Sequence, residues 1–354
     1  MKKILALLLA LLLLSGCSAT DNIATTPNTG APTVSGDLLV HFIDVGQADC
    51  ALLEYKGNYV LIDGGNVEDG SLVVSYLEQQ GVETLSAVIC SHAHEDHVGG
   101  LPAVLAVYPT EAVYAPTRTY SSKVFDDFLY YTDQQGLAVT IPAPGDTFTL
   151  GQDVQLSILG PTQSYADPND TSIIVLAQFG QTRFLFTGDM ETGAENDMLD
   201  YWGADFDWQV DVLKVGHHGS DTSTGYRFLN AVMPTHAVIS VGAGNSYGHP
   251  HEVPLSRLED AGCILYRTDE LGTVIAASNG SEITFTWGNQ NAQPDAAEPG
   301  DEPEETVFIG NKNSKKFHTD TCANLPSEEN RVTFESYDAA IDAGYTPCGN
   351  CLGD

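Results

Sequence analysis

The chain has 354 residues, 48 of them acidic and 14 basic, so its formal net charge is −34. The length fits one large domain or two, and apolar residues make up 42%, which is enough for a sizeable core. A protein with this net charge repels a polyanion such as a nucleic acid at long range. Efficient capture is excluded unless local cations, with metal ions as the best source, neutralise the negative charge.

The N-terminus has the features of an export signal. Two lysines precede an apolar stretch over 4–14 that is short for a membrane span, and small residues follow it. Leu14-Ser15-Gly16-Cys17 resembles a bacterial lipobox, which implies a signal peptide at 1–16 and a lipid on the sulfur of Cys17. We therefore expect an extracytoplasmic lipoprotein anchored in a membrane by its lipid chains. The alternative is an ordinary signal peptide with a chance cysteine.

A flexible tether is predicted over 17–36, where residues are small and polar, and a domain of mixed strands and helices over 37–287. The expected strands are 38–43, 51–55, 59–62, 85–90, 154–159, 173–179, 183–187, 210–215, 237–241, 264–267, 273–277 and 283–286. The expected helices are 71–80, 101–107, 123–135, 193–201, 225–231 and 254–261. This order favours sheets that are covered by helices.

A second, smaller domain is expected at the end of the chain. Residues 288–305 are acidic, contain prolines and lack any apolar period, so they are predicted to form a linker. Apolar residues return from 306 onward, which indicates a small domain over 306–354.

A cluster of histidines marks the candidate site of the larger domain. His92, His94, Asp96 and His97 fall within six positions, directly after a predicted buried strand. Imidazoles and carboxylates are ligands for zinc and similar divalent ions. A metal would give His92 and His94 a shared partner, and Asp96 and His97 could then bind a second ion. The alternative, a polar loop with coincidental histidines, is disfavoured by this density.

The pattern H-x-H-x-D-H over 92–97 is the signature of the metallo-β-lactamase superfamily, and the turns Ile62–Gly65 and Phe186–Asp189 resemble further motifs of that family. Three segments resemble one branch, the extracytoplasmic hydrolase domain of the competence protein ComEC. They are HFIDVGQAD (41–49), LKVGHHGS (213–220) and NSYGHP (245–250). The resemblance implies an α/β fold, the αββα four-layer sandwich, over 37–287.

The resemblance also implies two divalent metals, zinc or manganese. The first would bind His92, His94 and Asp189. The second would bind Asp96, His97, the bridging Asp189 and one of His217 and His218. Many relatives carry a further histidine ligand where this chain has 167–172, so the first site is expected to be loose or to favour manganese.

Hydrolysis by a hydroxide that bridges the two metals is the implied reaction. The candidate catalytic residues are Asp96, His218 and His249. For His249, a role as substrate contact or proton donor competes with a structural role. Hydroxyls expected to contact the substrate belong to Ser220, Thr222, Ser223 and Tyr247. Structural roles are expected for His41, His236 and His251.

The resemblance favours an extracytoplasmic phosphodiesterase, with a nuclease related to DNA uptake as one form. The negative charge argues against capture of long DNA by this domain alone, so a phosphorylcholine or wall-polymer phosphodiester is the alternative substrate. Hydrolysis of β-lactams ranks third, because the further histidine is missing. Outside the enzymes, the alternative is a surface binding protein with the same fold. No protein partner is predicted.

The small domain carries the spacing H-x3-C-x25-C-x2-C at His318, Cys322, Cys348 and Cys351. Four such ligands can form a closed, structural zinc site, and a domain with little core often needs such a staple. This zinc-stapled α+β module resembles the zinc-binding module of the Ada DNA-repair protein, which implies a module able to touch DNA. The alternative is a disulfide and a spare cysteine. The remaining cysteines, Cys50, Cys90 and Cys263, are expected in the core.

Overall fold

The structure is a computed structural model that describes residues 36–295, 307–320, 322–335, 337–349 and 351–352. The predicted signal peptide, the lipidation site Cys17 and the tether up to residue 35 lie outside the described residues, as does 296–306 of the predicted linker. Within the described ranges, no helix combines the length and apolarity needed to cross a membrane.

The larger domain contains two seven-stranded sheets. The first has the order β14 (Ile283–Trp287), β13 (Val274–Ser278), β1 (Leu38–Phe42), β2 (Ala51–Tyr55), β3 (Asn58–Ile62), β4 (Ala87–Ile89) and β5 (Val113–Tyr114). The strands from β14 to β3 pair antiparallel, whereas β3, β4 and β5 are parallel neighbours. The turn between β2 and β3 is tight because Lys56 and Gly57 both have positive φ, at 49° and 78°.

The second sheet has the order β12 (Ile264–Arg267), β11 (His236–Ile239), β10 (Val212–Lys214), β9 (Thr182–Phe186), β8 (Ile174–Phe179), β7 (Val154–Gly160) and β6 (Thr147–Leu150). The four strands from β9 to β12 are parallel. Their carboxyl ends therefore lie along one edge of the sheet, and those of β3 and β4 lie along one edge of the first sheet.

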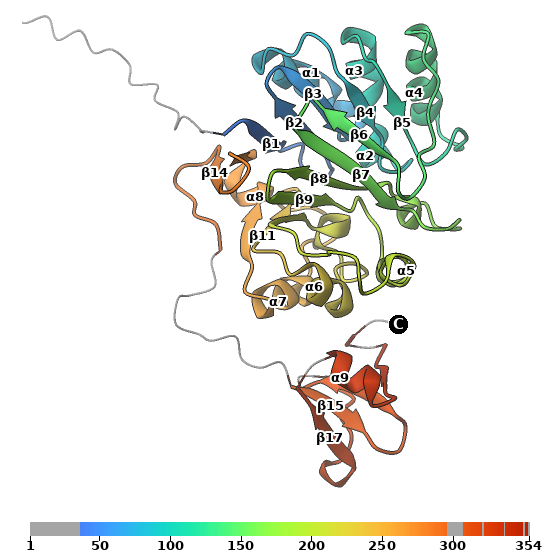
Figure 1. Cartoon of the computed structure of the whole chain (residues 1–354), viewed down its shortest axis with the longest axis vertical. Coiled ribbons are helices and arrows are strands. Elements are labelled where there is room, and N and C mark those ends of the chain that lie inside the picture. The colour runs from blue at the N-terminus through green and yellow to red at the C-terminus, as the bar shows by residue number, and fades with distance from the viewer. Residues whose placement is uncertain (1–35, 296–306, 321, 336, 350, 353–354) are drawn as a thin grey trace, which may run out of the picture. The chain divides into compact units, whose positions relative to one another are not determined.

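Successive side chains along a strand point to opposite faces of its sheet. One set forms a core between the two sheets, and the other set forms a core between each sheet and the helices that cover it. Leu53 and Val175 face the inner core, whereas their neighbours Leu52 and Ile174 face the helices. The first sheet is covered by α1 (Gly70–Gln79), α3 (Leu101–Val107) and α4 (Lys123–Gln134). The second is covered by α5 (Thr192–Trp202), α6 (Tyr226–Val232) and α7 (Glu252–Asp260) (Figure 1). The predicted αββα sandwich is confirmed.

Several short elements escape prediction from the sequence. They are β5, β6, α2 (Glu95–Val98), α8 (Thr268–Leu271), and the 3-10 turns η1 (Val67–Asp69), η2 (Asn169–Thr171), η3 (Gly216–Gly219) and η4 (Glu328–Asn330). Each has two to four residues, which is too few for a period of apolar side chains to show.

The first residues of the predicted linker contact the larger domain. The indole nitrogen of Trp287 donates to the carbonyl of Ala292 at 3.1 Å, and Asp295 pairs with Leu265 of the edge strand β12. These contacts attach residues 292 and 295 of the predicted linker to the larger domain.

The small C-terminal module is a four-stranded sheet with one helix. The strand order is β17 (Arg331–Phe334), β15 (Phe308–Asn311), β16 (Lys316–Thr319) and β18 (Thr346–Pro347), and α9 spans Tyr337–Asp342. Its buried apolar core consists of Phe308, Phe317, Tyr337, Ala340, Tyr345 and Leu352. So small a core gives little stability by itself, which is consistent with the need for a staple.

Candidate metal centre

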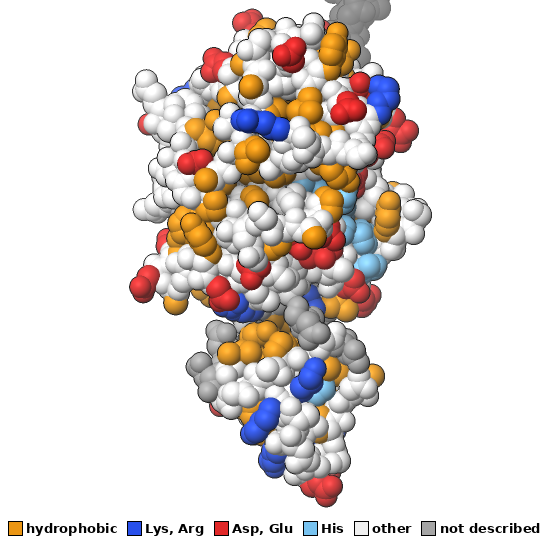
Figure 2. All heavy atoms as spheres, turned by 90° about the vertical axis from the view of Figure 1, so that its right-hand side faces the viewer, with side chains coloured by type: hydrophobic (Ala, Val, Ile, Leu, Met, Phe, Trp, Pro, Cys, Tyr) orange, Lys and Arg blue, Asp and Glu red, His pale blue; other side chains and the backbone are white. Residues whose placement is uncertain are grey.

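Loops at the carboxyl ends of parallel strands carry the acidic and histidine residues to one place. Asp63 follows β3, the segment 92–97 follows β4, Asp189 follows β9, and His217 and His218 follow β10. Figure 2 shows histidine side chains, in pale blue, gathered on one face of the larger domain with carboxylates beside them.

The histidine segment changes from loop to helix in its middle. His92 lies in the loop after β4, and His94 is the extended residue that precedes α2, with φ −71° and ψ 152°. Asp96 and His97 belong to the first turn of α2. This change of direction lets one short segment present its side chains to two neighbouring positions.

The glycine pair after α2, Gly99 and Gly100, allows close packing against the loop after β3. A Cβ on Gly100 would lie 2.1 Å from the carbonyl oxygen of Gly64, so only glycine fits here. This approach brings His97 against the loop after β3, where its Nδ1 lies 2.9 Å from Asp63 Oδ2. Asp63 also accepts from the backbone N–H and the hydroxyl of Ser91, both at 2.7 Å.

His217 and His218 are consecutive residues in the left-handed backbone conformation, which turns their side chains toward the site. His217 and His218 have φ of 49° and 53°, and Gly219 follows with φ 81°. A residue other than glycine in the left-handed backbone conformation costs on the order of 1–3 kcal/mol. The surrounding structure must therefore hold both histidines in place. The His217 N–H donates to Gly188 O at 3.1 Å, and His218 Nδ1 lies 3.0 Å from Ser240 O.

Four of the predicted ligands form a compact group. Ligand atoms of Asp96, His97, Asp189 and His218 all lie within 4.8 Å of one another. His97 Nε2 is 3.2 Å from Asp189 Oδ1, and His218 Nε2 is 3.3 Å from Asp96 Oδ2. Three of these atoms (His97 Nε2, His218 Nε2 and Asp189 Oδ1) are buried without a hydrogen-bond partner. Such atoms fit a divalent cation in the position of the predicted second metal.

The geometry favours His218 over His217 as the ligand of this second centre. The side chain of His218 is buried, and its Nε2 faces Asp96 and Asp189. The side chain of His217 is 23% exposed, and its Nε2 lies 3.6 Å from Asp189 Oδ2.

A buried ion pair orients His218 from behind. Asp49 Oδ1 lies 3.2 Å from His218 Nδ1, and Asp49 Oδ2 lies 2.8 Å from Lys214 Nζ. Asp49 and Lys214 are 5% and 4% exposed. Both His97 and His218 thus have a carboxylate at Nδ1, which leaves Nε2 for a metal.

The electrostatics of the group also favour cations. Burial lowers the pKa of His97, but Asp189 and Asp63 outweigh it and hold that pKa well above its usual range. Burial likewise lowers the pKa of His218, yet Asp189 and Asp49 raise it to about 10. Without a metal both imidazoles would carry a proton at neutral pH, so metal binding must release protons from this group.

The predicted first centre is less compact. His92 Nε2 lies 3.1 Å from His94 Nδ1 and 3.9 Å from Asp189 Oδ2, and His94 is half-buried. Burial and the neighbouring His97 hold the pKa of His92 well below its usual range, so its imidazole is neutral and available to a metal. The residues of the first centre fit a cation of their own, which would be held less tightly than the cation in the second centre.

An asparagine lies in the segment where relatives carry the further histidine. Asn169 Oδ1 is buried without a hydrogen-bond partner, and its amide nitrogen lies 3.5 Å from Glu191 Oε1. Asp170 instead accepts from the Glu191 N–H at 3.0 Å. Asn169 is therefore a better candidate than Asp170 for an oxygen ligand of the first metal.

A groove of about 610 Å³ opens beside the centre. Its lining consists of Gln47, Asn66, Val67, Glu68, Glu95, Asp96 and Tyr247. Asp96 belongs both to this lining and to the compact ligand group. The predicted substrate contact Tyr247 is 68% exposed, so its ring is available to a molecule in the groove.

Two of the other predicted substrate contacts do not face the groove. Ser220 and Ser223 are 4% and 0% exposed, so their hydroxyls are out of reach of a substrate, contrary to the prediction. Thr222 is exposed, but its Oγ1 lies 3.3 Å from His217 Nδ1 and 3.0 Å from Ser220 Oγ. Thr222 therefore orients His217.

His249 lies at the site, as the sequence predicts for a substrate contact or proton donor. Its ring centre is 5.8 Å from that of His217, 6.4 Å from that of His218 and 5.7 Å from that of Tyr247. Burial and the neighbouring His251 lower the pKa of His249 to about 4, so the imidazole is neutral at physiological pH.

The other histidines have local contacts away from the ligand group. His41 Nδ1 is 2.8 Å from the hydroxyl of Tyr76, and the His236 ring packs on Phe285. His251 Nδ1 accepts from the Asp221 N–H at 3.0 Å. These contacts agree with the structural roles expected for all three.

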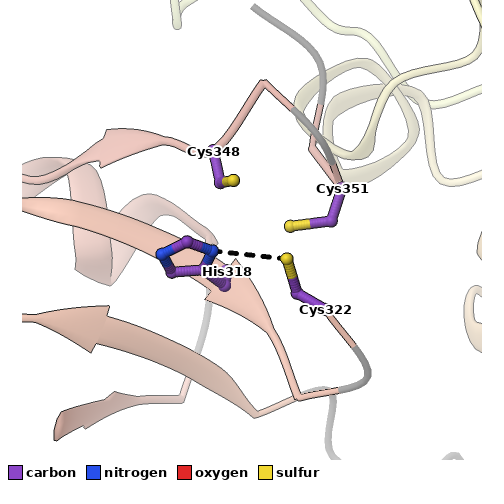
Figure 3. Close-up of side chains that lie close together, drawn as sticks. All are labelled: His318, Cys322, Cys348 and Cys351. Atoms are coloured by element: carbon purple, nitrogen blue, oxygen red, sulfur yellow. Dashed lines mark hydrogen bonds between the residues drawn. The ribbon is translucent and has the colours of Figure 1, made fainter. Parts of the chain in front are cut away.

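The second candidate metal site is in the C-terminal module. Ligand atoms of His318, Cys322, Cys348 and Cys351 lie within 4.8 Å of one another, and the four side chains point toward one centre (Figure 3). His318 Nδ1 is 3.4 Å from Cys322 Sγ. All three cysteines are free thiols, which disfavours the disulfide alternative. The set fits a tetrahedral zinc.

Sequence reasoning missed the residues behind the ligands. Asp49 and Lys214 lie within the quoted segments 41–49 and 213–220, and Asp63 lies in the quoted turn 62–65, yet none of them receives a role from spacing alone. A charged residue inside an otherwise apolar strand, such as Lys214 at the end of β10, is the signal that could have found the ion pair.

Comparison with known proteins identifies the family. The sequence profile of the metallo-beta-lactamase superfamily matches residues 43–243. The chain belongs to this superfamily. Residues 1–18 match the prokaryotic membrane lipoprotein lipid attachment site.

Relatives within the superfamily include competence proteins. The chain is 29% identical to ComE operon protein 3 of Bacillus subtilis over 262 residues, which is 69% of this chain and 33% of that protein. It is 31% identical to competence protein ComA of Neisseria gonorrhoeae over 267 residues, or 75% and 35% of the two chains. Endoribonuclease YSH1 of Gibberella zeae matches at 31% over 83 residues, or 20% and 10%. The chain spans about a third of the length of the two competence proteins.

The buried pair of Asp49 and Lys214 yields a test of the support behind His218. An Asp49→Asn substitution should reduce the free energy of unfolding by about 3–5 kcal/mol, because Lys214 stays buried without its carboxylate. It should also weaken metal binding about 10–100-fold, because His218 keeps its contact with Ser240 O but loses the carboxylate beside Nδ1. Urea unfolding and zinc titration measure the two effects.

The pKa of Asp49 sets the pH range over which the pair with Lys214 stabilises the wild type. Burial raises this pKa, but Lys214 and His218 outweigh it and lower it from 3.8 to about 2. The pair therefore stabilises the wild type above about pH 4, and this stability is lost as pH falls toward 2. Asp127→Asn is the matched control, because Asp127 forms an exposed pair with Lys123. This variant should change neither the free energy of unfolding nor the strength of metal binding. Equal effects in both variants would contradict the role of Asp49.

Chelation tests the zinc site of the module. Removal of zinc should collapse the dispersed proton resonances of residues 307–352 and leave those of the larger domain dispersed, because the module's core is small. Cys348→Ser should have the same effect without a chelator. A module that keeps its dispersed spectrum after complete zinc removal would refute the assignment.

Proposed function

We propose that this chain is a divalent-metal-dependent phosphodiesterase that works outside the cytoplasmic membrane. The observation that carries the proposal is the compact group of Asp96, His97, Asp189 and His218, with three buried atoms left unpartnered. A binding protein without turnover would not need these groups beside a groove that shares Asp96 with them.

The first metal would be held by His92, His94 and Asp189, with Asn169 in the place of a further histidine. The second would be held by Asp96, His97, Asp189 and His218. Two bound divalent ions, zinc or manganese, would supply Lewis acidity and lower the pKa of a water molecule.

The side chains of the site divide the remaining tasks. Asp96 faces both the ligand group and the groove, so its carboxylate would accept a hydrogen bond from the attacking water and orient it. His249, neutral and next to the His217–His218 pair, would donate a hydrogen bond to the leaving oxygen. Tyr247 would contact the leaving group on the open side of the groove.

The lining of the groove bears on the substrate. It contains three carboxylates (Glu68, Glu95 and Asp96) and no lysine or arginine. A polyanionic chain laid along it would be repelled, whereas a single phosphodiester with a neutral or cationic substituent would not. We therefore place a small or wall-polymer phosphodiester ahead of long DNA, although competence proteins and an endoribonuclease are among the relatives.

The N-terminal match supports a membrane-anchored location. A lipid on Cys17 and a tether over 17–36 would hold the domain at the outer surface of the membrane. The C-terminal module would keep a structural zinc and have no catalytic role, because four protein ligands leave no open position.

A phosphodiester panel tests the proposal. The mature protein loaded with zinc or manganese should hydrolyse bis-p-nitrophenyl phosphate, and a phosphodiester of a small cationic alcohol should be a better substrate than a DNA oligonucleotide. His94→Ala should reduce turnover at least about 100-fold, in line with the loss of a residue essential to metal-ion catalysis. His236→Ala, away from the ligands, is the matched control and should retain activity.

The outcomes separate the alternatives. Turnover that survives in the His94→Ala variant would point to a contaminant. No turnover of any phosphodiester with either metal would favour the binding protein, and preferred hydrolysis of DNA would reverse the order of substrates.

A further inference from the structure

The amide of Gln47 bridges the loop after β1 and the loop that carries His249. Gln47 Oε1 lies 3.1 Å from the backbone nitrogen of Gly242, and Gln47 Nε2 lies 3.3 Å from His249 Nδ1. Gln47 and His249 are 202 positions apart and both are half-buried beside the groove. Neither the ligand sets nor the mechanism above uses Gln47.

The orientation of this amide follows from the chemistry of its partners. A backbone N–H can only donate, so the atom facing Gly242 must be the amide oxygen. The other end of the side chain is therefore the NH₂ group, which can only donate to His249. His249 Nδ1 must then be the unprotonated nitrogen, and the single proton of the neutral ring must be on Nε2.

The backbone around Gly242 holds this arrangement in place. A Cβ at position 242 would lie 2.6 Å from the backbone nitrogen of Gln47, so the two loops approach as closely as glycine permits. On the opposite side, Asn245 clamps His249: its Oδ1 accepts from the His249 N–H at 3.1 Å, and its Nδ2 donates to the His249 carbonyl at 2.6 Å. These contacts fix the backbones that the amide bridges, and turning the amide over would break its bond from the Gly242 N–H.

We infer that Gln47 is a positioning residue that fixes the tautomer of His249, so that His249 presents Nε2–H as a hydrogen-bond donor in the active site. Within residues 36–295 no hydrogen bond to His249 Nε2 is recorded, so this donor is available to a substrate oxygen. The inference deepens the proposed function and rests on it for the step in which His249 assists the leaving oxygen. The neutral ring donates a hydrogen bond from Nε2–H to that oxygen while its bond to phosphorus breaks, and the departing oxygen takes its proton from water, so the ring keeps its own proton.

The tautomer can be measured without any turnover. Nitrogen-15 NMR of the full mature chain, labelled in histidine and recorded with and without zinc, should show His249 Nδ1 in the unprotonated range and Nε2 in the protonated range. Gln47→Glu keeps the acceptor for Gly242 but replaces the donor with an acceptor. In this variant the Nδ1 signal should move to the protonated range.

A matched control separates this effect from added charge. Asn66→Asp adds the same charge in the same groove, at a residue with no contact to His249 in the described structure, and should leave the Nδ1 signal unprotonated. A protonated Nδ1 in the wild type would overturn the inference. So would an Nδ1 signal that stays unprotonated in Gln47→Glu.

A kinetic arm tests the use of the donor. His249→Ala should lower turnover of an alkyl phosphodiester by about 10²–10³-fold, the cost of removing one donor to a developing oxyanion, and that of a p-nitrophenyl ester much less, because p-nitrophenolate is a stable leaving group. Equal losses on both esters would overturn the donor role. If the wild type hydrolyses neither ester, the proposed function fails, and the NMR result still decides the tautomer.

Discussion

Three carboxylates buried between the strand ends set the central constraint on this structure. Asp49, Asp63 and Asp189 are 5%, 2% and 1% exposed, and a buried carboxylate without compensation costs several kcal/mol. Lys214 compensates Asp49, and His97 compensates Asp63. The basic groups within 4 Å of Asp189 in the described structure are all imidazoles, and its Oδ1 has no hydrogen-bond partner. The residue that would bridge two metals is therefore balanced only by side chains that must give up their protons to bind a metal.

The same constraint explains why the two predicted centres differ. In the second centre, Asp63 and Asp49 fix the Nδ1 sides of His97 and His218, so the Nε2 atoms are held in place before a metal arrives. In the first centre, His94 is half-buried and has no carboxylate behind it in the described structure. Folding, metal binding and proton release are therefore linked most tightly at the second centre. The buried pair behind His218 links the candidate ligand group to β10 of the second sheet.

The sequence predicts most of the fold and the ligands, and the reasons for its failures are local. Periodic apolar residues reveal long elements such as β7, β8 and α4, but α2 is too short for any period to show. The candidate ligands stand out in the sequence because His92, His94, Asp96 and His97 are crowded in one segment. Ser220 and Ser223 were misjudged because residue type does not reveal which way a turn faces. Asp49 and Gln47 lie far in sequence from the histidines they orient, so only the fold reveals their roles.

The central claim is that two metal cations bind at Asp189. Anomalous diffraction from crystals of the protein, recorded at the zinc and manganese edges, tests it most directly. The account predicts two peaks within bonding distance of Asp189, one among Asp96, His97 and His218 and a weaker one beside His92 and His94. Full-length crystals with no peak at Asp189, after growth in either metal, would contradict it.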